Sequence, residues 1–100
     1  MILDTNAISA WAEGEPRVLK LIEAQTFLCL PVIVIGEFRY GLRGSGKRAI
    51  LEPELDFLEQ TLRVLDITRE TAAVYATVRF ELKRRGTPIP ENDIWIAALA

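Results

Sequence analysis

The chain has 100 residues, of which 50% are hydrophobic and 26% charged, and its net charge is −2. This size and composition predict one globular domain with a small core and exclude a disordered chain. With no His and a single Cys, the sequence argues against a zinc site and against Ser-His or Cys-His catalysis. The longest apolar run, residues 27–36, is too short to cross a bilayer, so we expect a cytoplasmic protein that does not contact a membrane.

The first predicted element is a short buried parallel strand at residues 1–4. Its apolar residues run directly into Asp4, as they do where a strand emerges at the carboxyl edge of its sheet. Open α/β folds bind their ligands at that edge. Thr5 and Asn6 suit the turn into a helix over residues 7–12, which would place Asp4 before a helix N-terminus. The alternative, that Asp4 merely begins this helix, stays open on these residues alone.

A helix and a second strand come next. Pro16 suits the first turn of a helix that ends at residues 25–26, and residues 27–30 predict a buried strand that contains Cys29 as a small hydrophobic residue. The β-branched residues 32–35 would extend this strand by their local propensity.

Pro31 argues against that extension, because a central strand needs its backbone N–H groups. A helix that starts just after Pro31 places Glu37, Tyr40 and Gly41 on one face, and we adopt the helix.

The second half of the chain predicts three helices and one strand. After a break at residues 44–46, leucines at 51, 55, 58 and 62 mark a helical face that we expect to be kinked or restarted at Pro53. Residues 64–67 predict the third strand, and residues 68–85 an amphipathic helix that ends before Gly86.

Pro90 opens the last helix and places Asn92 and Asp93 in its first turn, where free N–H groups favour an anion. Strands that alternate with helices predict an α/β fold with a parallel sheet.

Three of the 14 acidic residues stand in apolar surroundings: Asp4, Glu37 and Asp93. A carboxylate removed from water needs a partner, yet no Lys or Arg adjoins Asp4 or Asp93 in the sequence. Clustered carboxylates that stay ionised require a cation, and Mg²⁺ or Mn²⁺ fits their oxygen ligands best. Asp66 has similar neighbours, but it precedes a helix that Thr68 can cap, so we expect a structural role there.

Basic residues lie near two of these acids although the net charge is negative. Arg39, Arg43, Lys47 and Arg48 follow Glu37, and residues 83–85 precede Asp93. Such patches could hold phosphates beside an acidic metal centre. The cluster at 83–85 also complements a helix C-terminus, which is reason enough for basic residues at that place.

Three segments together resemble the PIN domain, specifically the VapC-type toxins of toxin-antitoxin pairs. They are Asp4-Thr5-Asn6, then Glu37 with Tyr40-Gly41-Leu42, and residues 88–98. The resemblance implies a three-layer α/β/α fold and an Mg²⁺-dependent endoribonuclease. Its metal-holding and catalytic acids would be Asp4, Glu37 and Asp93, its substrate RNA, and its partner a cognate antitoxin.

Five more residues are candidates for contacts around that site. Thr5, Asn6 and Asn92 could donate hydrogen bonds that bridge a carboxylate and a phosphate, and Arg39 and Arg43 could offset phosphate charge.

Each of the two tryptophans has two alternative roles. For Trp95 we prefer core packing to base stacking, and for Trp11 we prefer packing to partner binding.

The end of the chain departs from the pattern that the resemblance implies. Residues 95–100 are apolar with no capping residue, whereas such domains continue with another strand and a fourth acid. We therefore expect a single PIN domain over residues 1–100 that is incomplete at its C-terminus. Such a chain would be a poor nuclease, and the exposed edge at residues 1–4 would favour a homodimer.

Two other functions stay open. One is a catalytically incompetent PIN-like module that acts by protein interaction. The other is a phosphatase with Asp4 as nucleophile, which is disfavoured because Asn6 stands where that chemistry usually has a further acid. The sequence does not indicate which RNA a nuclease of this kind would cleave.

Overall fold

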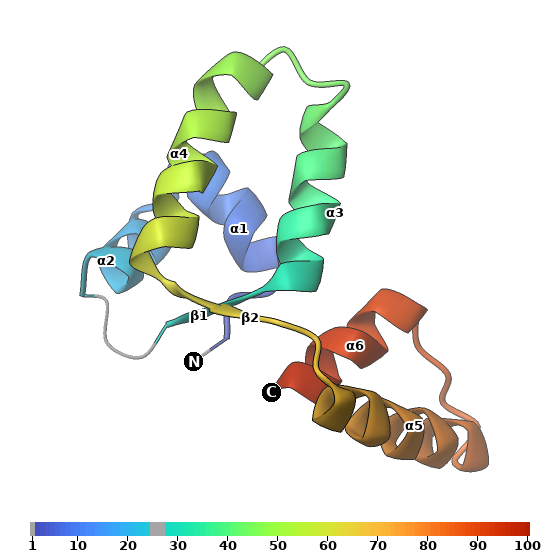
Figure 1. Ribbon diagram of the computed structural model, residues 1–100. Helices are drawn as coiled ribbons and strands as arrows, with labels where there is room; N and C mark the ends of the chain where they lie inside the picture. The colour runs from blue at the N-terminus through green and yellow to red at the C-terminus, as the bar shows by residue number, and fades with distance from the viewer. Residues whose placement is uncertain (1, 25–27) are drawn as a thin grey trace. The chain divides into compact units, whose positions relative to one another are not determined.

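The structure, a computed structural model, describes residues 2–24 and 28–100 (Figure 1). The chain forms two compact units, Met1–Leu65 and Asp66–Ala100. The first unit holds a small parallel sheet with four helices, and the second holds two helices.

The sheet of the first unit is short and parallel. Strand β1 (Cys29–Pro31) pairs with β2 (Arg63–Leu65), with Leu30 opposite Val64. Ile2 forms an isolated parallel bridge to Cys29, and the Leu3 N–H donates to the Cys29 carbonyl at 2.9 Å. β1 therefore lies between the N-terminal segment and β2, which confirms the predicted parallel sheet.

Three strand predictions need correction. The strand predicted at residues 27–30 runs over Cys29–Pro31, with Leu28 outside it and residue 27 outside the described residues. The strand expected at residues 1–4 is reduced to the single bridge at Ile2, and Met1 lies outside the described residues. The third strand ends at Leu65, so Asp66 and Ile67 are not part of it. Both are exposed, because the chain must turn there to reach the helix that Thr68 caps. Cys29 is half-buried rather than fully buried.

The helices of the first unit are α1 (Thr5–Ala12), α2 (Pro16–Ala24), α3 (Val32–Leu42) and α4 (Arg48–Thr61). Helix α1 begins two residues before its predicted start, because Asp4 is its N-cap. Helix α2 begins at Pro16 as predicted, and its predicted end at residues 25–26 lies outside the described residues.

Helix α3 forms in spite of its β-branched start. Pro31 is the last residue of β1 and, with φ −65° and ψ 139°, is also the extended residue that precedes the helix. Val34 and Ile35 are buried in the first turns of α3. The burial of these side chains outweighs their local preference for a strand, so the predicted helix is confirmed.

Helix α4 continues through Pro53, so of the two predicted alternatives the restart is wrong and the kink stays a prediction. Pro53 removes one backbone hydrogen bond near the start of the helix. The leucine face compensates, since Leu51, Leu55 and Leu58 are buried. Leu55 also belongs to the fully buried centre of the unit with Ile8, Leu30 and Val34, which brings α1, β1, α3 and α4 together.

A network of ion pairs joins α3 to α4, which Figure 1 shows as neighbouring helices connected by the loop at residues 43–47. The Arg39 guanidinium on α3 donates to Asp56 at 2.6 Å and to Glu59, and it approaches Glu52 at 3.9 Å. The hydrogen bond to Asp56 raises the pKa of Arg39 above its ordinary value. Three acids of α4 therefore share one cation of α3.

The second unit consists of α5 (Arg69–Arg84) and α6 (Glu91–Leu99). Thr68 accepts from the Thr71 N–H at 3.2 Å, and the Thr71 hydroxyl accepts in turn from the Thr68 N–H. This reciprocal cap confirms the predicted helix start. Gly86 follows the end of α5 with φ +70°, a conformation that favours glycine.

The two helices of this unit meet through aromatic side chains. Tyr75 stacks on Trp95 with ring centroids 3.9 Å apart, and the Tyr75 hydroxyl donates to Glu91 at 3.0 Å. This contact confirms the packing role that we preferred for Trp95. Across the described part of the chain, no helix is both long enough and apolar enough to span a bilayer.

Replacing Thr68 with Ala should lower the free energy of unfolding by about 1 kcal/mol, because an N-terminal N–H of α5 loses its acceptor. Urea unfolding followed by circular dichroism measures this. Thr77→Ala is the control, since Thr77 only donates back to the Ala73 carbonyl within the helix. Equal losses in both variants would contradict the capping argument.

Replacing Arg39 with Gln should destabilise the fold by about 1 kcal/mol at low salt, because three carboxylates of α4 lose their cation. The loss should shrink as salt rises, since the Arg39 side chain is 34% exposed and its ion pairs are screened. Thermal melts at two salt concentrations test this, with Arg43→Gln as the control. A loss that does not depend on salt would mean that Arg39 acts through packing instead.

Candidate functional site

Asp4 lies at the junction between the sheet and α1. Its backbone is extended, and its carboxylate Oδ1 accepts a hydrogen bond from the Ala7 N–H at 2.8 Å. Asp4 thus follows the bridged N-terminal segment and also begins the helix, so both interpretations of this residue hold. The side chain is exposed, and within the described residues its second oxygen has no hydrogen-bond partner.

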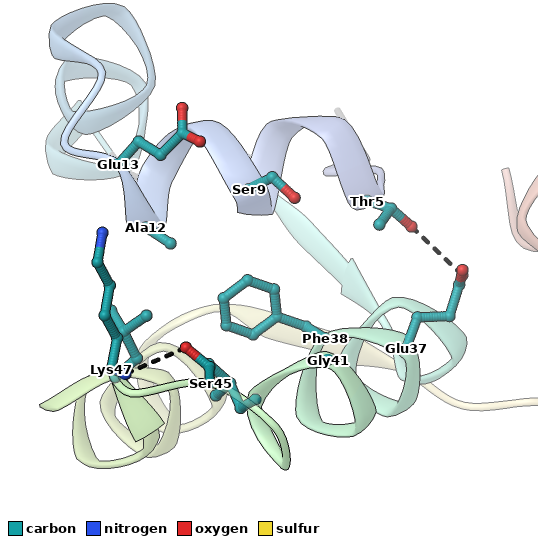
Figure 2. A pocket seen from close by; sticks show the side chains of 11 residues that line it. Thr5, Ser9, Ala12, Glu13, Glu37, Phe38, Gly41, Ser45 and Lys47 are labelled. Atoms are coloured by element: carbon teal, nitrogen blue, oxygen red, sulfur yellow. Dashed lines mark hydrogen bonds between the residues drawn. The ribbon is translucent and has the colours of Figure 1, made fainter. Parts of the chain in front are cut away.

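Glu37 reaches the same place from α3. The Thr5 hydroxyl donates to Glu37 Oε1 at 3.3 Å, a bond between residues 32 positions apart that joins α1 to α3 (Figure 2). Glu37 is half-buried. Thr5 directly follows Asp4 in the sequence, so Glu37 contacts the residue next to Asp4, and the assignment of both acids to one site stays a prediction.

Neither of these acids has a cation beside it. In residues 2–24 and 28–100, the ion pairs use other acids, and Asp4, Glu37 and Asp93 take part in none. Carboxylates with unbonded oxygens, such as those of Asp4 and Glu37, are the donors that a hard divalent cation prefers. The residues present in this unit therefore fit a divalent metal by their chemistry.

Asp93 belongs to the second unit. It lies in the first turn of α6, where its backbone N–H donates to the Pro90 carbonyl at 3.0 Å and its side chain is exposed beside Asn92. This position was predicted correctly. Within either unit, no three described His, Cys, Asp or Glu side chains form a metal-binding group. The assignment of Asp93 to the same site as Asp4 and Glu37 stays a prediction.

The other candidate residues differ in whether their side chains already form ion pairs. Asn6 is exposed on α1, and Arg43 is exposed after α3 with no ion pair in the part of the chain described. Arg39, by contrast, is committed to Asp56 and Glu59. The sequence did contain a signal for this pairing, because residues 52, 56 and 59 follow the i, i+4, i+7 spacing of one helical face.

A pocket opens beside Glu37 on the same face of the first unit. Its volume is about 310 Å³, and its lining includes Thr5, Ser9, Glu37, Phe38 and Lys47. Figure 2 shows Glu37 and Lys47 at opposite ends, with the Phe38 ring between them. The Trp11 ring packs edge-on against Phe38, with the ring centroids 6.2 Å apart and an angle of 61° between the ring planes. Sequence reasoning did not find this pocket.

Comparisons with known proteins relate the chain to one family. The family model described as PIN domain matches residues 1–100. Ribonuclease VapC2 of Haemophilus influenzae is 33% identical over 103 residues, which cover 99% of this chain and 76% of the relative. Ribonuclease VapC2 of Rickettsia felis is 29% identical, with 99% and 77% covered.

Solved structures show the same relationship. The DNA-bound VapBC complex of Salmonella typhimurium contains a chain that is 28% identical, with a TM-score of 0.87, over 99% of this chain and 76% of that one. VapBC2 of Rickettsia felis bound to promoter DNA gives 27% identity and a TM-score of 0.85, over 99% and 78%. These matches confirm the predicted PIN-like α/β/α fold, and the chain belongs to the VapC-type branch of the PIN domain family.

Proposed function

We propose that this protein is the toxin of a toxin-antitoxin pair and a metal-dependent endoribonuclease that hydrolyses RNA phosphodiester bonds. The observation that carries the proposal is the Thr5–Glu37 hydrogen bond, which links Glu37 to the residue after Asp4, while neither acid forms an ion pair in the described part of the chain. The relatives named ribonuclease support the reaction, and the neighbouring structures titled VapBC support the assembly with an antitoxin.

The metal ligands in this proposal are Asp4, Glu37 and Asp93, and the ion is Mg²⁺ or Mn²⁺. When bound, the metal supplies an activated water and stabilises charge on the phosphate. Asp4 is held by its cap to α1, and Glu37 by the Thr5 hydroxyl, so both carboxylates are oriented before a ligand arrives.

The remaining candidates act on the substrate. Asn6 and Asn92 offer amide donors for phosphate oxygens or for the ligating carboxylates. Arg43 is exposed and offsets phosphate charge better than Arg39, whose guanidinium is already surrounded by acids. In this proposal Arg39 supports α3, and Arg43 contacts RNA.

Asp4→Asn should abolish metal binding and RNA cleavage while the fold is retained. Asn caps a helix about as well as Asp, so this change removes the charge but keeps the cap. The melting temperature without metal should stay equal or rise slightly, because repulsion from Glu37 is relieved. Titration calorimetry with Mn²⁺ measures the metal affinity, and digestion of a mixed RNA pool with Mg²⁺ measures the cleavage rate. The affinity and the rate should each fall more than about 100-fold.

Glu23→Gln is the matched control for charge, since Glu23 is exposed on α2 and far in sequence from each proposed ligand. A large drop in the melting temperature of Asp4→Asn would show that Asp4 is structural. If the unchanged protein binds no Mn²⁺ and leaves RNA intact, the interaction module is the better description.

An apolar groove of the first unit supports the proposed antitoxin partner. It measures about 460 Å³ and is lined by Trp11, Leu19, Ile22, Pro53, Glu54, Phe57 and Leu58. Phe57 is 65% exposed in this groove, so its ring is available to an apolar partner surface. The homodimer expected from the sequence remains a further prediction.

Phe57→Glu should weaken the complex with the protein encoded by the neighbouring reading frame by at least about tenfold, because a charge then enters an apolar contact. Ile50→Glu is the matched control. Ile50 lies on the same helix and is 66% exposed, but it is not part of the groove. Co-purification followed by surface plasmon resonance gives the affinities. Equal weakening by both variants would remove the groove from the interface.

A further inference from the structure

The pocket beside Glu37 has no assigned role in metal binding or in the proposed contact with an antitoxin. It is formed within the first unit by α1, α3 and the loop that leads into α4. Its volume of about 310 Å³ falls at the lower end of the range for small-ligand sites, roughly 300–1,000 Å³. A single nucleotide is a ligand of this size class.

The pocket has an acidic side chain at one end and a basic side chain at the other. Glu37 lies at one end in Figure 2 and Lys47 at the other. Lys47 is the only cation of the lining, which also carries Glu13, and its ammonium forms no ion pair within residues 2–24 and 28–100. Without Lys47 the walls would carry only negative charge and would repel a phosphate.

The middle of the pocket is suited to a base. The Phe38 ring lines it between the two ends and is supported from the side by Trp11. Ser9 adds a hydroxyl from α1. The Ser45 hydroxyl accepts from the Lys47 N–H at 3.1 Å, which holds the loop beneath Lys47. An aromatic ring beside a cation is an arrangement that proteins use for unpaired nucleotides.

We propose that this pocket is a nucleotide subsite that binds one unpaired nucleotide next to the scissile phosphate. The base lies against Phe38, and the neighbouring phosphate binds Lys47. The inference rests on the proposed ribonuclease function and assigns Phe38 and Lys47 to one nucleotide of its substrate, which enters unpaired because a paired base would first have to be extruded from its duplex.

Binding of a short fluorescein-labelled single-stranded RNA, measured by fluorescence anisotropy in EDTA, tests the subsite apart from cleavage. Lys47→Gln should raise Kd about fivefold at about 50 mM salt and should reduce the slope of log affinity against log salt by about 0.7, the value of one single-strand phosphate contact. Lys20→Gln, which removes an exposed cation of α2 outside the pocket, should change neither quantity.

Ser9→Phe is the second variant, because it fills the pocket from an exposed position of α1 that the fold does not need. It should raise Kd for single-stranded RNA about tenfold, within the energy of one base stacked on an aromatic ring. Its melting temperature should match that of the unchanged protein. The same RNA annealed to its complement should bind more weakly than the single strand.

The subsite is overturned if Lys47→Gln and Ser9→Phe both bind single-stranded RNA like the unchanged protein, even when cleavage with Mg²⁺ is strong. It is also overturned if duplex binds as well as single strand. It stands if both variants lose binding as described, even when no RNA is cleaved, in which case the ribonuclease function alone fails.

Discussion

Pro31 is the constraint on which the candidate site depends. Pro31 has no backbone N–H to donate to a neighbouring strand. Strand β1 ends at this residue, and α3 begins at Val32. A strand continued through residues 32–35 would alternate its side chains and carry Glu37 away from α1. Because a helix forms instead, Glu37 lies in the second turn of α3 and meets Thr5 beside Asp4.

Helix α3 is held from two opposite sides. Successive residues of a helix are about 100° apart, so Glu37 and Arg39 point in directions about 200° apart. Glu37 accepts from Thr5 on α1, and Arg39 donates to Asp56 and Glu59 on α4. A shift of α3 along either neighbour would break one of these contacts. This arrangement explains why a basic residue so close to a candidate metal ligand is used for support rather than for substrate.

The sequence predicted the features that depend on single residues and missed those that depend on packing. Helix starts at Pro16 and after Pro31 and Pro90 follow from the fixed φ of proline, and the cap of α5 follows from the Thr68 side chain. The continuation of α4 through Pro53 was missed, because the buried leucines that outweigh one lost hydrogen bond come from the tertiary fold. The pairing of Arg39 and the pocket at Phe38 needed the distance between α3 and its neighbours, which no local pattern contains. For the candidate site, the acids were predicted from their apolar neighbours, and the hydrogen bond between Thr5 and Glu37 required the structure.

Each of the three candidate acids lies at a helix N-terminus or accepts a hydrogen bond from a hydroxyl. Asp4 is the N-cap of α1 and Asp93 lies in the first turn of α6, so each has a helix N-terminus whose dipole and free N–H groups favour a carboxylate. Glu37 is inside a helix, where that support is absent, and it has the Thr5 hydroxyl instead. An arginine beside any of them would stabilise the charge more strongly, but it would also occupy the oxygens that a metal needs. The helix N-terminus at Asp4 and the neutral Thr5 hydroxyl at Glu37 each leave one carboxylate oxygen without a hydrogen bond in the described part of the chain, as the proposed metal would require.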